Sequence, residues 1–73
     1  MEIELDIHNM TKIEARILLE RMIDSAKKDT QIRVIHGYRK GNELLKMVRG
    51  MKHKRIKQKI LTLNFGETIL VID

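Results

Sequence analysis

The feature that most constrains the fold of this chain is the alternation of segments with the two-residue hydrophobic period of a strand and segments with the three-to-four-residue period of a helix. Apolar and polar residues alternate strictly over residues 2–8 (EIELDIH), which is the period of a strand with one solvated face. Thr11 and Glu14 then have the spacing of a helix capping box, and the apolar residues after them recur at intervals of three and four. These patterns predict a strand over 2–8 and a helix over about 12–27.

The rest of the chain repeats the same two periods. A short β-branched strand is predicted over 31–35, where Val34 and Ile35 are typical of a central strand buried on both faces. A second helix over about 42–51 has Asn42 as its expected cap, and residues 56–63 and 68–72 are expected to form a hairpin through 64–67. This order predicts an α/β (α+β) two-layer sandwich, in which two helices pack on a small mixed sheet containing a parallel pair.

Composition limits the kind of site that such a fold can carry. The 73 residues suit a single domain, 1–73, and the absence of cysteine excludes disulfides, thiolate metal sites and cysteine nucleophiles. The longest apolar run, residues 69–72, is too short to span a membrane, and the first residues lack the pattern of an export signal. We therefore expect a soluble, unexported, cytoplasmic protein.

Positive charge is concentrated in the second half of the chain. Residues 1–24 carry six acids and three bases, whereas residues 39–59 carry nine Lys and Arg against one Glu, a net +8. Such density predicts a nucleic-acid partner, because each cation that neutralises a phosphate releases counterions. The alternative is a solvated helix face and an edge strand guarded by lysines. The nucleic-acid contacts that we predict here are Lys52, Lys54 and Arg55, with His53 on the same basic surface.

Two other binding modes are disfavoured: binding to a membrane surface and stacking of bases on an aromatic platform. No apolar aromatic face accompanies the charge, so a membrane surface is a weaker candidate partner. Tyr38 and Phe65 are the only aromatic residues, which argues against a platform for stacked bases.

Polar residues follow the first two predicted strands, whose ends the parallel topology brings to one edge of the sheet. Asp6 and His8 end the first strand, and the second leads into His36-Gly37-Tyr38-Arg39-Lys40-Gly41 before a helix. In that context glycine amides and a helix amino terminus hold phosphate, and Arg39 and Lys40 would add charge. The alternative is a strand-to-helix turn shaped by two glycines.

Histidines at neighbouring strand ends suggest acid–base chemistry. His8 and His36 could transfer protons at a phosphodiester, and a bond from Asp6 to an imidazole would fix its tautomer. The alternatives are a buried His36 bonded to a carbonyl and a His8 that is merely an exposed strand end. A divalent metal held by Asp6, His8 and His36 is a further alternative, but no dense carboxylate cluster supports it, so we predict no cofactor.

These residues also resemble a known family. Leu5-Asp6-Ile7-His8 resembles the LDxH motif of the Smr (small MutS-related) domain, and its distance from Ile35-His36-Gly37 resembles that family's spacing to HGxGxG. The closing Gly66-Glu67-Thr68-Ile69 is similar as well. The resemblance implies a fold similar to the carboxyl-terminal domain of translation initiation factor three. It also implies binding of branched DNA or RNA, which several members cleave.

Carried over by residue, the resemblance implies a cleavage role for Asp6 and His8 and a binding role for His36, Gly37 and Gly41. Two family glycines are replaced, one by Asn9 and the middle glycine of the loop by Arg39. Our prediction is a nucleic-acid-binding Smr domain with endonuclease activity on DNA or RNA. The alternative is a non-catalytic nucleic-acid-binding or adaptor module of a MutS-like or ribosome-associated protein. Sequence does not choose between DNA and RNA and does not give the oligomeric state.

Overall fold

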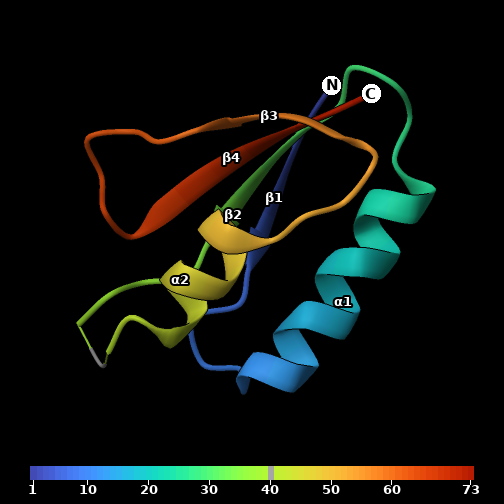
Figure 1. Cartoon of the computed structure of the whole chain (residues 1–73). Helices are drawn as coiled ribbons and strands as arrows, with labels where there is room; N and C mark the ends of the chain where they lie inside the picture. The colour runs from blue at the N-terminus through green and yellow to red at the C-terminus, as the bar shows by residue number, and fades with distance from the viewer. Residues whose placement is uncertain (40) are drawn as a thin grey trace.

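The structure, a computed structural model, describes residues 1–39 and 41–73. Its elements follow the predicted order (Figure 1): β1 (Glu2–Asp6), α1 (Lys12–Ser25), β2 (Gln31–Ile35), α2 (Glu43–Gly50), β3 (Ile56–Ile60) and β4 (Glu67–Ile72). The predicted α+β class with a small mixed sheet is therefore confirmed. Within the described residues, no helix has the length and apolar character needed to cross a membrane.

The four strands form one sheet in the order β1-β2-β4-β3. β1 and β2 are parallel, with Leu5 opposite Val34, and β4 runs antiparallel to both of its neighbours. The Ile7 amide donates to the Ile35 carbonyl at 2.9 Å, which extends the parallel pairing beyond the end of β1. The carboxyl ends of β1 and β2 therefore lie side by side, as the alternation of strands and helices predicted.

Both helices cover the same face of the sheet (Figure 1). Every second residue of the strands points into the core between the two layers, and the core side chains are those of Ile7, Ala15, Leu19, Ile23, Ile32, Val34, Met47, Val48, Met51, Leu70 and Ile72. The other face of the sheet is solvated and carries an ion pair of 2.8 Å between Arg33 and Glu4. Ile35 lies on that face and is only half-buried, because no second helix layer covers it. The expectation that β2 is buried on both faces was wrong at this residue.

The amino ends of the two helices differ. At α1 the predicted capping box is present: the Thr11 hydroxyl accepts from the Glu14 amide at 3.2 Å, and the Glu14 carboxylate accepts from the Thr11 amide. At α2, Asn42 occupies the cap position but makes no side-chain cap bond. The first amides of α2 are therefore not satisfied by that side chain.

Two basic side chains from β3 and the segment before it bind the carboxyl ends of the helices. The Arg55 guanidinium donates to the carbonyls of Ile23 at 2.6 Å and Ala26 at 2.7 Å, at the end of α1. Lys59 donates in the same way to the carbonyls of residues 49 and 51, at the end of α2. Cations at these positions satisfy orphan carbonyls and oppose the negative end of the helix dipole. Part of the basic stretch is thus used inside the fold.

The β3–β4 pairing confirms the predicted hairpin, but β3 ends at Ile60 and not at residue 63. The Thr62 hydroxyl donates to the Asn64 carbonyl at 3.1 Å and accepts from the Asn64 amide at 3.2 Å. Such local side-chain bonds compete with the strand ladder and form a turn instead. Leu61 and Leu63 consequently lie in an exposed connection.

Candidate functional site

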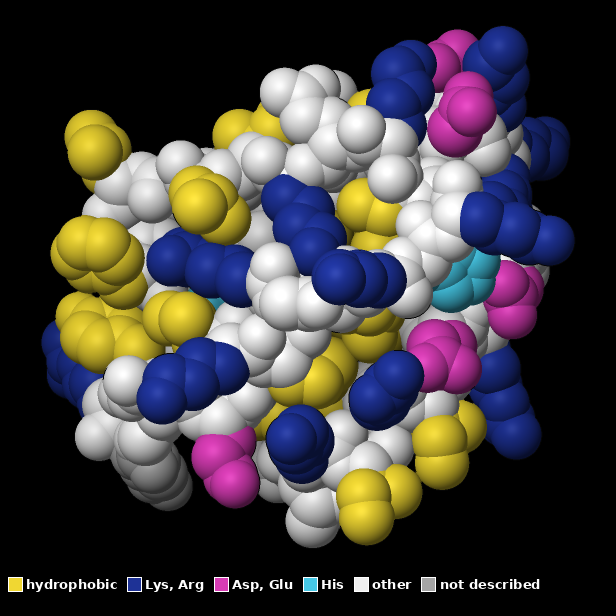
Figure 2. Space-filling view, viewed as in Figure 1, with side chains coloured by type: hydrophobic (Ala, Val, Ile, Leu, Met, Phe, Trp, Pro, Cys, Tyr) yellow, Lys and Arg dark blue, Asp and Glu magenta, His cyan; other side chains and the backbone are white. Residues whose placement is uncertain are grey.

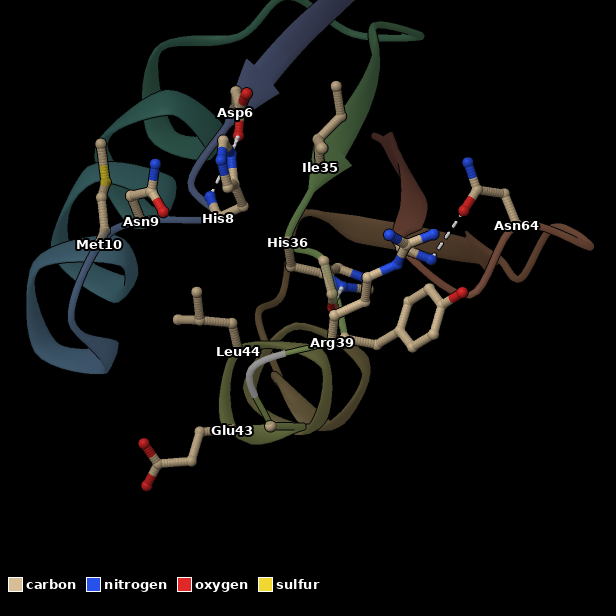
Figure 3. A pocket seen from close by; sticks show the side chains of 14 residues that line it. Asp6, His8, Asn9, Met10, Ile35, His36, Arg39, Glu43, Leu44 and Asn64 are labelled. Atoms are coloured by element: carbon tan, nitrogen blue, oxygen red, sulfur yellow. Dashed lines mark hydrogen bonds and ion pairs between the residues drawn. The ribbon is translucent and has the colours of Figure 1, made fainter.

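An open cleft of about 870 Å³ lies where the carboxyl ends of β1 and β2 meet the loop before α2 and the β3–β4 connection. Figure 3 shows Asp6 and His8 on one side of it and Arg39 and Asn64 on the other. The predicted site residues that line this cleft are Asp6, His8, His36, Gly37, Tyr38, Arg39 and Gly41. The strand ends and the glycine loop are therefore assembled at one place, whereas Lys40 lies outside the described residues.

Asp6 and His8 form a hydrogen-bonded pair at the mouth of the cleft. Nδ1 of His8 lies 2.5 Å from Oδ1 of Asp6, and the His8 amide donates to the same oxygen at 3.1 Å. Both side chains are about half exposed, at 50% each. The hydrogen bond from the imidazole, followed by that from the amide, lowers the pKa of Asp6, so the carboxylate stays ionised. A carboxylate bound to Nδ1 holds the proton there and leaves Nε2 as an acceptor.

His36 is only 3% exposed and makes bonds through both of its ring nitrogens. Nδ1 donates to the Gly37 carbonyl at 2.9 Å, and Nε2 lies 2.9 Å from the hydroxyl of Thr68. Because a carbonyl can only accept, these partners place the proton on Nδ1 and make Nε2 the acceptor of the Thr68 hydroxyl. Nε of Arg49 donates to that hydroxyl in turn, at 3.0 Å. A chain of hydrogen bonds thus joins α2, β4 and the end of β2.

This environment disfavours the predicted role of His36 as a second acid–base group. Burial lowers the pKa of His36 because the charged imidazolium would lose its hydration, so the neutral form is favoured. Neither nitrogen is left to meet a substrate. The alternative of a buried histidine bonded to a carbonyl is the one that the structure bears out. Within residues 1–39 and 41–73, no group of three or more potential ligands is arranged to hold a metal ion, so the set Asp6, His8 and His36 is not assembled as a metal site.

The glycine loop depends on backbone conformation. Gly37 has φ +71° and Gly41 has φ +119°, both in the region that side chains rarely adopt. The Gly37 amide, expected to face a phosphate, instead donates to the Gly66 carbonyl at 2.9 Å, as does the His36 amide. A Cβ on Gly37 would lie 3.5 Å from that of His8, an ordinary contact. Gly37 is therefore required for the shape of the loop, and its own amide is not available to a ligand.

The predicted cationic contacts are divided between two places. Arg39 is exposed and lines the cleft. Lys52 and Lys54 are exposed in the connection after α2, beside a second hollow of about 470 Å³. α2 has 8 residues and spans about 12 Å between these places.

Arg55 and His53 depart from the predicted basic surface. The guanidinium of Arg55 donates to four carbonyls, so four of its five N–H groups are used inside the protein. His53 is 16% exposed, lies 3.0 Å from the Asp24 carboxylate through Nε2, and accepts the Arg55 amide through Nδ1. Both residues serve the junction at the end of α1, and a nucleic-acid contact by Arg55 is no longer expected.

Sequence reasoning missed the residues that hold the loop in place. Thr68 is fully buried and bridges Arg49 to His36, while Gly66 accepts both loop amides. The signal was present for Thr68: a hydroxyl at an inward position of a strand, alternating with Leu70 and Ile72, needs a buried partner. Nothing in the sequence identified Arg49 as that partner.

Comparison with known proteins agrees with this geometry. The family model of the Smr domain matches residues 5–66, which includes the Asp6–His8 pair, the glycine loop and Gly66. The chain belongs to the Smr domain family. Smr domains are a nucleic-acid-binding, nuclease-like family. No curated protein and no solved structure matches the chain.

Proposed function

We propose that this Smr domain cleaves phosphodiester bonds in DNA or RNA and that His8 transfers the proton. The observation that carries the proposal is the Asp6–His8 pair at the mouth of the cleft, with Nδ1 of the imidazole held by the carboxylate. Among the described residues, Nε2 of His8 has no protein partner, whereas both ring nitrogens of His36 and of His53 are bonded. His8 is therefore the imidazole able to meet a substrate.

In the proposed reaction, Nε2 of His8 accepts the proton of the attacking oxygen, which belongs to water or to a sugar hydroxyl. That oxygen bonds to phosphorus as the bond to the leaving oxygen breaks, and the leaving oxygen takes a proton from solvent. Asp6 acts through His8 as a positioning residue: it fixes the tautomer and stabilises the imidazolium that forms. The lowered pKa of Asp6 keeps it ionised for this role.

Phosphate binding is assigned to cations around the cleft. Arg39 lies across the cleft from His8, and its guanidinium can form a bidentate contact with phosphate (Figure 3). Lys52 and Lys54, past the far end of α2, would contact the same strand further along. Glu43 lines the cleft, but its carboxylate points away from Asp6, His8 and Arg39 in Figure 3.

A binding or adaptor module without catalysis is the second candidate. It is favoured by the Gly37 amide, which is bonded to Gly66, and by the burial of His36. Because the Gly37 amide and the His36 ring are already bonded within the protein, fewer groups are available to stabilise a reacting phosphate than the sequence led us to expect.

Cleavage and binding measured in parallel distinguish the two. Purified protein is incubated with labelled branched DNA and structured RNA, with and without EDTA, beside Asp6→Asn and His8→Ala. An amide at position 6 can donate to Nδ1 and force the wrong tautomer, so cleavage should fall by about 10²- to 10⁴-fold while affinity changes little. Cleavage should persist in EDTA.

Glu4→Gln is the matched control, because Glu4 lies on the same face of β1 and loses the same charge without touching His8. It should cleave like the wild type. Binding without cleavage by the wild type would establish the adaptor. Cleavage by Asp6→Asn at the wild-type rate would remove the role of the pair.

A further inference from the structure

The two aromatic residues of the chain meet beside the cleft, which Tyr38 lines, although they are 27 positions apart in sequence. Tyr38 follows β2 and Phe65 precedes β4, and their ring centroids lie 6.3 Å apart with an angle of 78° between the planes. This is the edge-to-face geometry that aromatic pairs prefer. The chain has one Tyr, one Phe and no Trp. The fold therefore builds from these two rings a surface that composition alone argued against.

The rings are not buried by this contact. Tyr38 is 46% exposed and Phe65 63% exposed, and Leu63 in the same connection is 99% exposed. Figure 2 shows hydrophobic side chains gathered at the end of the molecule formed by the β3–β4 connection. A group of exposed apolar side chains beside a cleft is typical of a binding surface.

Hydrogen bonds order the segment that carries Phe65. The side chain of Asn64 accepts from the Gly66 amide at 2.8 Å, and the Asn64 carbonyl accepts from the amide of Glu67 at 3.2 Å. The Thr62 hydroxyl closes the turn from the other side. The backbone at Phe65 is therefore ordered before a ligand binds, which reduces the conformational entropy that this segment loses on binding.

The position of the pair indicates its ligand. Tyr38, Asn64 and Gly66 line the same cleft as Arg39 and His8. An aromatic ring beside a guanidinium matches a nucleotide, whose base stacks on the ring while its phosphate meets the cation. A base within a duplex is already stacked on its neighbours, so only an unpaired base can use such a ring. A purely apolar protein partner would gain nothing from Arg39.

We propose that Tyr38 and Phe65 form a stacking site for an unpaired base adjacent to a phosphate in the cleft. The substrate would then be a single strand, or a strand with unpaired nucleotides next to a duplex. This inference rests on the proposed nucleic-acid binding and does not depend on cleavage.

Two oligomers that differ only in their bases test the proposal. Affinities of the protein for an oligothymidylate and for an abasic oligomer of the same length are measured at the same salt concentration. Stacking predicts that the thymidylate binds about 5- to 150-fold more tightly. Tyr38 is the only tyrosine and the chain has no tryptophan, so tyrosine fluorescence reports on Tyr38 alone. This fluorescence should be quenched by the thymidylate and not by the abasic oligomer.

Three variants locate the effect. Phe65→Ala should remove the preference for bases and leave binding to the abasic oligomer unchanged, whereas Phe65→Tyr should keep it. Ile17→Ala is the control, because Ile17 is an apolar residue of α1 that is 50% exposed. It should keep the preference. Circular dichroism verifies that each variant is folded.

The outcomes separate this inference from the proposed function. Equal wild-type affinity for the two oligomers would overturn the stacking site and leave phosphate binding by the cleft intact. Binding to neither oligomer would overturn the proposed nucleic-acid function and the stacking site with it. A preference that survives in Phe65→Ala would also reject the stacking site.

Discussion

Arg55 is the basic residue whose loss should damage the fold most. Its guanidinium donates to the carbonyls of Ile23, Asp24 and Ala26 at the end of α1 and to that of Asp73 at the end of the chain. The Ile23 carbonyl also accepts the Ala26 amide at 3.4 Å, and carbonyls in the last turn of a helix generally lack the amides of a following turn. Replacement by Ala removes the donors, the positive charge at the negative end of the helix dipole and the packing of the side chain.

The size of the effect follows from the environment of each bond. The bonds to Ile23 and Ala26 are partly buried, and hydrogen bonds to charged groups contribute about 1.5–3 kcal/mol each before the freed carbonyls regain water. The bonds to Asp24 and Asp73 are exposed and should add little, because water replaces them. We therefore expect Arg55→Ala to lower the free energy of unfolding by about 2–4 kcal/mol. A chain of 73 residues has roughly 4–11 kcal/mol in total.

Urea unfolding followed by circular dichroism measures this loss. Lys54→Ala is the matched control, since Lys54 is the neighbouring cation and is exposed. It should change the free energy of unfolding by less than about 0.5 kcal/mol. Arg55→Lys should fall between the two, because an ammonium keeps the charge but cannot reach several carbonyls with a planar fork.

A loss in Arg55→Ala no larger than that in Lys54→Ala would refute the capping role. The slope of the unfolding free energy against urea should stay the same in all three variants, since the same surface is exposed on unfolding. A change in slope would mean that the variant alters the unfolded or the native ensemble, and the comparison would then need a second probe of structure.

Three further predictions concern the loop, the buried histidine and the exposed cations. Gly37→Val should destabilise the fold by about 1–3 kcal/mol and weaken nucleic-acid binding, because φ is +71° there. Gly37→Asn should lose less stability and less affinity, since Asn tolerates this region of φ. Urea unfolding and binding isotherms measure both effects. Burial lowers the pKa of His36, so the unfolded state binds its proton more readily; the stability that the neutral ring contributes is full above the unfolded pKa of about 6.5 and falls as the pH drops from there towards the folded pKa. Urea midpoints between about pH 8 and about pH 5 should show this fall, and an equal fall in His36→Gln would contradict it. Lys52→Ala and Lys54→Ala should each reduce the slope of log affinity against log salt by about one, and unchanged slopes would exclude them as phosphate contacts.

The elements of the fold could be predicted because their signals are local. The alternation over residues 2–8 and the Thr11–Glu14 box each act within a few positions. The box is present, and the strand forms over Glu2–Asp6, two residues shorter than expected. The Asp6–His8 hydrogen bond is local too, because His8 lies in the turn directly after β1, where an Asp side chain reaches the amide and the side chain two residues further on. Prediction was accurate where the physical interaction and the sequence pattern share the same short range.

The remainder of the site depends on contacts between distant parts of the chain. Arg55 reaches a carbonyl 32 positions earlier, and Nε2 of His36 meets a hydroxyl 32 positions later. No hydrophobic period or residue spacing in the sequence indicates either partner. A cation that caps a helix therefore cannot be distinguished, from its neighbours in the sequence, from a cation that binds phosphate. For the same reason the Tyr38–Phe65 pair could not be foreseen from two isolated aromatic residues.

The distribution of bonds among the cations limits how many phosphates the described part of the basic stretch, residues 39 and 41–59, can neutralise. Nine basic residues fall within 39–59, but Arg49, Arg55 and Lys59 donate to groups inside the protein, and Lys57 lies 3.5 Å from the carboxylate of Asp29. The exposed cations that remain among the described residues of this stretch are Arg39, Lys46, Lys52 and Lys54. Each phosphate contact contributes about 0.7–0.9 to the salt slope, so these cations support a slope near 3, well below the value that a net +8 would suggest. With so few phosphate contacts, the proposed base stacking would make a large share of the difference in affinity between nucleic-acid strands. Specificity would then depend on the residues of the cleft more than on the net charge of the chain.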